Sequence, residues 1–182
     1  MDFNLFFRAL KPDDANFINE LRKNKEMENL IGGPKRFISL ERDRKWVNEL
    51  IFSDNPGSIY LAICEQGADD IIGYTSIAEI DYRNGSCTWS GIKIAPEKSG
   101  RGYGLQVALL IIKHIFEELR MVRCYIVTQE EHQVILKLVE KVGFRKEGLM
   151  RKHLFKNGVY KNSWLLSILD TDYPAIKEQY GL

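Results

Sequence analysis

A glycine-rich segment is the part of this sequence whose residue types and spacing could do chemistry. Gly100, Gly102 and Gly104 alternate between a predicted strand and a long predicted helix. Alternating glycines let the backbone approach a ligand, and the first N–H groups of a helix can point at one spot at the positive end of the helix dipole. This arrangement suits a pyrophosphate. The alternative is that the glycines only make a tight turn from strand to helix.

Spacing excludes two common phosphate-binding loops. A Walker A loop ends in Gly-Lys-Ser or Gly-Lys-Thr, and no such triplet follows these glycines. The dinucleotide-binding fingerprint places its third glycine three residues after the second, where this chain has Leu105. The loop therefore fits neither class.

The segment resembles the GNAT acetyltransferases, whose motif is Gln/Arg-x-x-Gly-x-Gly/Ala after a strand and a proline. Gly102 and Gly104 fall on the two glycine positions, with Pro96, Gly100 and Arg101 as common neighbours. The likeness spans nearly the whole chain and is greatest to the branch of ribosomal-protein and spermidine acetyltransferases. It is carried by Arg36-Phe37-Ile38, Trp46, Ile72-Gly73, the run from Ile92 through Gly104, Glu140-Lys141-Val142-Gly143-Phe144, Glu147-Gly148, the Asn157-Gly158 turn and the closing strand.

The resemblance implies a binding site for acetyl-CoA as co-substrate. Its pyrophosphate would be held by the loop residues Gly100, Arg101, Gly102, Tyr103, Gly104 and Leu105. Its pantetheine arm would lie beside the splayed end of a strand and bond to the backbone of Ile92, Lys93 and Ile94. Lys137, on a later helix, faces the nucleotide phosphates or is a solvated helix lysine.

The reaction implied is transfer of an acetyl group to a primary amine by direct attack on the thioester. Positioning and backbone donors supply much of such catalysis. An alkyl amine with an unperturbed pKa near 10.4 is neutral at pH 7 only on the order of one part in a thousand. A base that removes the proton, directly or through water, should therefore help.

Glu79 is the candidate base, because it follows an apolar strand and resembles an acidic position of the spermidine-type members. It could equally be a solvent-facing strand carboxylate. Asp81 is a weaker candidate because it adjoins the Asn84-Gly85 turn. His132 stands where many members have Asn, and it could donate to the cofactor, relay a proton or simply be exposed at a helix start.

Three further positions depart from the family pattern. Ser99 replaces the usual Gln or Arg, Ile135 replaces a frequent Ser, and Val139 replaces the tyrosine that often protonates the leaving thiolate. That acid is therefore not available, although a CoA thiol can leave without one. The missing tyrosine also supports an alternative function, a non-catalytic or regulatory acyl-CoA-binding module.

Composition indicates a single globular domain over residues 1–182, with 45% hydrophobic and 28% charged residues. No apolar run approaches the roughly 18 residues that span a bilayer, and Asp2 stands where a signal peptide would be basic, so we expect a cytoplasmic protein. Lys and Arg number 26 against 25 acids without long blocks, which argues against nucleic-acid or membrane binding. Three scattered cysteines, predicted to be reduced core thiols, suggest neither disulfides nor a metal site.

Hydrophobic periodicity predicts the elements that position the loop. Strands are expected at 3–10, 59–63, 71–82, 87–94, 122–128, 149–155 and 159–169. Helices are expected from Pro12 to about Ile31, stopped by Gly32-Gly33-Pro34, then after a Ser39 cap, over 105–119 and over about 131–142. This order predicts an α/β (α+β) fold. The resemblance adds a mixed, mostly antiparallel sheet of about seven strands with helices on both faces.

The acceptor amine is left open among a protein N-terminus, a polyamine, an amino sugar and an antibiotic. A polyamine site would favour clustered carboxylates, but the acids between residues 26 and 49 are interleaved with Lys and Arg, which disfavours a polycation. Phe37, Trp46, Tyr82 and Trp89 could line an acceptor pocket or belong to the core. Dimers are common in the superfamily, so a homodimer also stays open.

Overall fold

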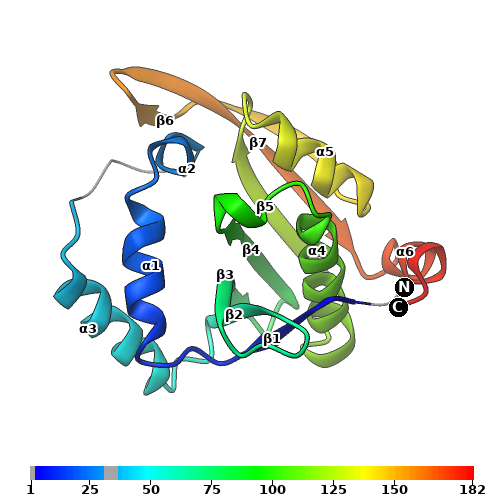
Figure 1. Ribbon diagram of the computed structural model, residues 1–182. Coiled ribbons are helices and arrows are strands. Elements are labelled where there is room, and N and C mark those ends of the chain that lie inside the picture. Colours follow the sequence, from blue (N-terminus) through cyan, green and yellow to red (C-terminus); the bar gives the residue numbers. More distant parts are fainter. Residues whose placement is uncertain (1–2, 31–36) are drawn as a thin grey trace.

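The computed structural model describes residues 3–30 and 37–182, which form a seven-stranded sheet between two groups of helices (Figure 1). The strand order is β1-β2-β3-β4-β5-β7-β6, and neighbours are antiparallel except β4 and β5. The strands are β1 Leu5–Arg8, β2 Ile59–Glu65, β3 Ile71–Asp81, β4 Ser86–Ile94, β5 Arg123–Gln129, β6 Arg145–Lys156 and β7 Val159–Leu169. The predicted mixed, mostly antiparallel sheet is confirmed.

Helices cover both faces of the sheet, also as predicted. The first group is α1 Asp14–Arg22, α2 Lys25–Leu30 and α3 Leu40–Ile51. The second is α4 Tyr103–Lys113 with its π-helical continuation His114–Glu118, α5 Gln133–Lys141 and α6 Tyr173–Tyr180. A short 3-10 helix, η1, covers Pro96–Lys98 between β4 and α4. Within the described ranges no helix is both long and apolar enough to cross a membrane.

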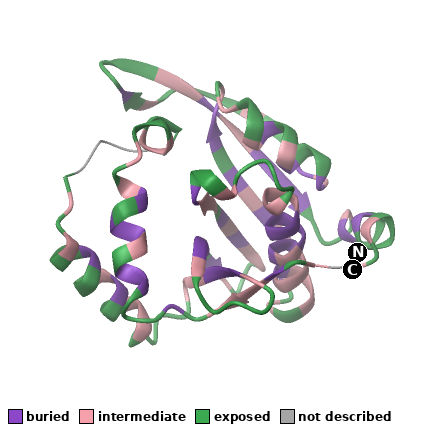
Figure 2. Ribbon diagram, viewed as in Figure 1, coloured by how far each residue is buried: buried purple, intermediate pink, exposed green. Residues whose placement is uncertain are grey.

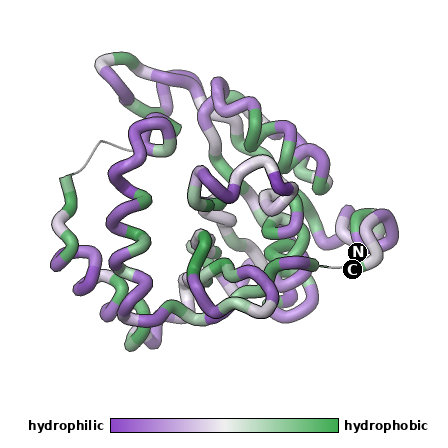
Figure 3. Tube along the Cα trace, in the orientation of Figure 1, coloured by the Kyte–Doolittle hydropathy of each residue, from purple (hydrophilic) through white to green (hydrophobic). Residues whose placement is uncertain are grey.

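Successive side chains of each central strand point to opposite faces of the sheet, and this produces two hydrophobic cores. Ile63 of β2 packs among the residues that α4, α5 and α6 bury, whereas Ala62 and Cys64 pack against α1 and α3. In Figure 2 buried residues recur along the central strands of the sheet and along α1 and α4. In Figure 3, hydrophilic and hydrophobic residues alternate along α1, as expected of a helix with one side on the core. The three cysteines are buried and free, as the sequence predicted.

The prediction of one helix as far as Ile31 is wrong, because the chain breaks into α1 and α2 at Lys23 and Asn24. The Asn24 side chain accepts a 2.9 Å hydrogen bond from the Met27 N–H, which starts α2 in a new direction. The predicted stop at Gly32-Gly33-Pro34, like Arg36 of the family resemblance, lies outside the described residues.

Two turn and cap predictions are confirmed. Ser39 Oγ accepts a 3.2 Å hydrogen bond from the Arg42 N–H at the start of α3. Asn157 and Gly158 both have positive φ, 52° and 82°, at the turn between β6 and β7.

Two elements differ from the sequence prediction. Helix α6 was not predicted, although it buries Tyr173 and Ile176 against the main core. Strand β6 begins at Arg145 rather than Leu149, because Arg145 pairs with Ser167 in β7. It is an edge strand with mostly exposed side chains, so it lacks the alternating pattern that marks a half-buried strand.

Candidate functional site

The parallel strands β4 and β5 diverge shortly after they begin. Their pairing covers only Ser86–Thr88 against Arg123–Tyr125. From Trp89 to Ile94, β4 is paired with β3 on one side only, so its other edge offers free backbone donors and acceptors. Such an edge can bond an extended ligand as though it were another strand.

A bulge in β4 lies at the point of divergence. Gly91 has a φ of 87°, and the register against β3 shifts between Thr75 and Ile77. Thr75 Oγ1 donates a 2.8 Å hydrogen bond to the Gly91 carbonyl and accepts one of 2.9 Å from Trp89 Nε1. Since Trp89 and Thr75 are each 1% exposed, the bulge is fixed from the buried side.

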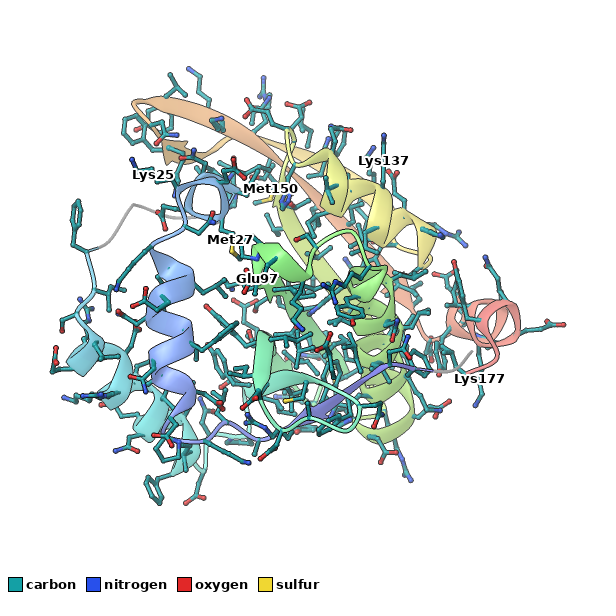
Figure 4. All side chains as sticks on the ribbon, in the orientation of Figure 1. Lys25, Met27, Glu97, Lys137, Met150 and Lys177 are labelled. Carbon is teal, nitrogen blue, oxygen red and sulfur yellow. The ribbon has the colours of Figure 1, made fainter. Side chains whose placement is uncertain are left out.

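A cavity of about 590 Å³ occupies the opening between the two strands. One end is formed by the loop before α4 and the other by Met27 and Leu30 of α2, with α5 and the β6–β7 hairpin along the side. Figure 4 shows Met27 projecting from α2 towards η1 and the end of β4. The other lining residues are Thr88 to Ile94, Lys98 to Gly100, Gly102 to Gly104, Ile126 to Gln129, His132, Val134, Ile135, Leu138, His153, Leu154 and Ser163.

The glycine loop leaves free amides at the N-terminus of α4. The bond from the Gln106 N–H to the Gly102 carbonyl, 3.3 Å long, is the first of the helix, so the amides of Tyr103, Gly104 and Leu105 precede it. Gly100 and Gly102 have positive φ, 77° and 76°, and a Cβ on either would meet no described atom within 4 Å. The loop therefore presents unhindered N–H groups where an anion is favoured.

Glu65, at the end of β2, anchors this loop, a role that the sequence analysis missed. Its carboxylate accepts 2.6 Å hydrogen bonds from Lys98 Nζ and from the Tyr103 hydroxyl, and Arg101 lies 4.0 Å away. Lys98, followed by Tyr103, holds the pKa of Glu65 below its ordinary value. No local pattern marks Glu65, because β2 and the loop are more than thirty residues apart in sequence.

The structure brings most of the predicted cofactor residues together. Ile92, Lys93, Ile94, Gly100, Gly102, Tyr103 and Gly104 all line the cavity. Arg101 is at its margin with a side chain 54% exposed, and the Leu105 side chain packs on the core, so only its amide can serve. Lys137 is exposed, lies outside the lining and projects from the outer side of α5 in Figure 4.

Glu79 lies beside the cavity rather than in its lining. It occupies an irregularity of β3 and has a positive φ of 50°, which is costly for a residue with a side chain. Its carboxylate accepts hydrogen bonds from the Thr88 hydroxyl, at 2.6 Å, and from the Tyr125 hydroxyl. These bonds, that of Thr88 first, lower the pKa of Glu79. Thr88 itself lines the cavity.

His132 and Val139 have different surroundings on α5. His132 is the N-cap residue, lines the cavity and has a pKa lowered by burial, so it is mostly neutral at pH 7. Val139 is fully buried in the core and offers no acid. Within the described part of the chain, no group of three or more His, Cys, Asp or Glu residues is placed to hold a metal ion.

Comparison with known protein families identifies the family to which this fold belongs. The model of the acetyltransferase (GNAT) domain matches residues 4–145. The chain belongs to the GNAT acetyltransferases.

Relatives of this GNAT acetyltransferase include proteins named as N-acetyltransferases. The spermidine N(1)-acetyltransferase of Vibrio cholerae is 27% identical over 173 residues, which cover 95% of this chain and 97% of the relative. The SPbeta prophage-derived N-acetyltransferase YokL of Bacillus subtilis (strain 168) is 26% identical over 159 residues, which cover 86% of this chain and 85% of the relative. The fold matches a crystal structure of the Vibrio cholerae spermidine N-acetyltransferase in complex with CoA and spermine, with a TM-score of 0.85 and 24% identity. The match covers 94% of this chain and 98% of that structure's chain.

Aromatic residues of this GNAT acetyltransferase divide between core and surface. Trp89 is buried and lines the cavity, and Trp46 packs edge-on against Tyr60 in the second core. Phe37 and Tyr82 are 89% and 57% exposed and lie outside the lining. Of the four aromatic residues considered for an acceptor pocket, Trp89 alone lines the cavity.

His153 was not foreseen as a cavity residue. His153 Nδ1 lies 3.1 Å from Ser163 Oγ, and both residues line the cavity. The register of β6 against β7 brings them there, and it shifts at an irregularity between Met150 and Leu154.

Proposed function

We propose that this protein is an N-acetyltransferase that transfers the acetyl group of acetyl-CoA to a primary amine by direct attack in a ternary complex. One observation carries the proposal: a single cavity runs from the glycine loop before α4, past the free edge of β4, to α2. A thioester held at the loop end and an amine entering at the α2 end would meet beside β4. Such positioning is a large part of catalysis in acyl transfer.

The residues present fit CoA. The amides of Tyr103, Gly104 and Leu105 would bind the pyrophosphate at the N-terminus of α4. The free edge of β4 from Trp89 to Ile94 would bond the amides of the pantetheine arm. The side chains of Val134, Ile135 and Leu138 would exclude water from its other side. Acetyl-CoA would supply the activated acetyl group as a thioester.

We also propose how this chain handles the proton of the amine. Glu79 accepts a hydrogen bond from the hydroxyl of Thr88, a residue that lines the cavity, so Glu79 would receive the proton through Thr88 rather than by direct contact. The strained φ of Glu79 is consistent with a functional role. His132, mostly neutral, would donate a hydrogen bond to the cofactor.

The class of acceptor proposed is a small-molecule amine or a protein N-terminal amine. Relatives named for spermidine favour the small molecule. The buried Val139 leaves no tyrosine at the family's acid position, and a CoA thiol can leave as the thiolate without one.

Two measurements test the proposal. Acetyl-CoA at about 100 times its Kd should stabilise the protein by about 2.7 kcal/mol, raising Tm by several degrees, whereas NAD and ATP should not. A CoA-release assay over a panel of primary amines should then show turnover. Equal stabilisation by NAD would refute the cofactor assignment. Stabilisation without CoA release from any amine would instead support an acyl-CoA-binding module.

A further inference from the structure

Lys93 lies on the face of β4 that is turned towards the end of the cavity where the amine would enter. Lys93 pairs with Tyr74 across β3 and β4, and its Nζ lies 4.8 Å from the centroid of the Tyr74 ring. Tyr74 belongs to the core under α1 and α3, whereas Ile92 and Ile94 pack on the core under α4. Lys93 therefore lines the cavity on the side away from the glycine loop's helix.

The described lining of the cavity contains no aspartate or glutamate. Its ionisable side chains are Lys93, Lys98, Tyr103, His132 and His153. Lys98 is already paired with Glu65 at 2.6 Å. Among the described lining residues, an amine would therefore meet only positive or neutral side chains.

Two carboxylates of the first helix group are already engaged with cations. Asp43, 1% exposed, lies 3.0 Å from Arg22 Nε and accepts a 2.8 Å hydrogen bond from Asn19. Glu28 of α2 lies 2.8 Å from Nζ of the buried Lys156. Asp43 thus joins α3 to α1, and Glu28 joins α2 to β6, so neither acid is free to bind a second ammonium group of an acceptor.

Lys93 has no carboxylate partner among the described residues. Its Nζ lies over the Tyr74 ring, and the positive charge of Arg22 bears on it. Burial, followed by Arg22, lowers the pKa of Lys93 to about 8. A partly buried cation without a counter-ion is costly, and a ligand that brings an anion removes that cost.

We propose that the acceptor amine carries a negatively charged group, such as a carboxylate, that pairs with Lys93 at the α2 end of the cavity. Amines with a second positive charge are then poor acceptors. The inference rests on the proposed acetyl transfer and adds the charge class of its substrate. It also separates this chain from relatives named for spermidine.

The test uses three matched series of primary amines with two to six carbons: ω-amino acids, unbranched alkylamines and α,ω-diamines. These probes share the reacting group and length and differ only in the charge of the far end. The best ω-amino acid should exceed its matched diamine in kcat/KM by about tenfold or more, with the alkylamine between them, because like charges repel across a desolvated contact. Calorimetric titration of each probe into the CoA-saturated protein should give the same order.

Variants assign the preference to Lys93. Lys93→Gln should abolish the difference between ω-amino acid and diamine, and Lys93→Arg should retain it. Lys45→Gln is the matched control, because Lys45 is 78% exposed on α3 and lies outside the lining. A preference that survives in Lys93→Gln would overturn the inference.

The two proposals fail differently. Turnover that is fastest with a diamine would overturn the anionic acceptor and leave acetyl transfer standing. Absence of CoA release from every probe would count against acetyl transfer, and the titrations would then decide the inference alone. Tighter binding of ω-amino acids than diamines supports it, while the reverse order, or no binding by any series, overturns it.

Discussion

Lys93 Nζ lies 4.8 Å above the Tyr74 ring, so a cation and an aromatic ring share the partly buried wall between β3 and β4. Burial drives their pKa values apart: that of Lys93 falls to about 8 and that of Tyr74 rises to about 12. The charged groups that bear on the pair are Arg22 of α1 and Asp43 of α3, which are paired with each other. The ammonium ion is thus held at a cost in the free protein.

Replacing Lys93 by Met should stabilise the free protein at pH 7 by about 1–3 kcal/mol. The folded pKa, about 8, is below the ordinary value of 10.5, so the unfolded chain binds this proton more tightly. The loss of stability from burying the charged Lys93 is complete below about pH 8 and shrinks as pH rises towards 10.5. Urea unfolding of both proteins at pH 7 and pH 10 measures the difference. If the difference in unfolding free energy between the two proteins does not narrow at pH 10, Lys93 is not a cation that destabilises the fold.

Gly102 tests the pyrophosphate site. Asp and Asn have nearly the same shape and tolerate positive φ better than most residues, so both variants should fold. Gly102→Asp places a negative charge beside the phosphates and should weaken CoA binding at least tenfold, about 1.4 kcal/mol, relative to Gly102→Asn. Calorimetry with CoA, alongside the Tm of each free protein, makes the comparison. Equal affinities in the two folded variants would place the pyrophosphate elsewhere.

Glu79 and Thr88 should act as one unit in proton removal. Glu79→Gln and Thr88→Val should each lower kcat for an identified amine, and the double variant should lower it little further, since either change breaks the same hydrogen-bonded path. The deficit should shrink between pH 7 and pH 10 as the amine loses its proton unaided. Additive, pH-independent losses with unchanged CoA affinity would show a structural role instead.

Gly73 allows β3 to pack closely on the paired edge of β4, and the opposite edge of the same segment would bind the cofactor. A Cβ at this position would lie 2.4 Å from the Lys93 carbonyl oxygen, so Gly73→Ala must displace β4. The expected loss is about 1–3 kcal/mol of stability together with weaker CoA binding. Gly148→Ala is the matched control, because its Cβ would meet nothing within 4 Å. Thermal unfolding and CoA titration of both variants check this, and an unaffected Gly73→Ala protein would refute the close packing.

Local sequence was sufficient wherever a short segment determines its own geometry. Gly100 and Gly102 have positive φ and open Cβ positions, as expected of glycines that let a loop approach a ligand. The Ser39 cap and the Asn157-Gly158 turn formed as predicted, because each depends on hydrogen bonds or φ values within a few residues. The order of strands and helices likewise follows from hydrophobic periodicity.

Only the tertiary structure decided which distant side chains meet. Glu65 reaches the glycine loop across 38 positions to Tyr103, and Glu79 reaches Tyr125 across 46, and neither spacing leaves a local signal. The sequence predicted only a backbone contact for Lys93. The β3–β4 register places its side chain over the Tyr74 ring, and among the described residues no carboxylate pairs with it. Sequence sets periodicity and backbone conformation, whereas strand register and the divergence of β4 from β5 determine which charges share a cavity.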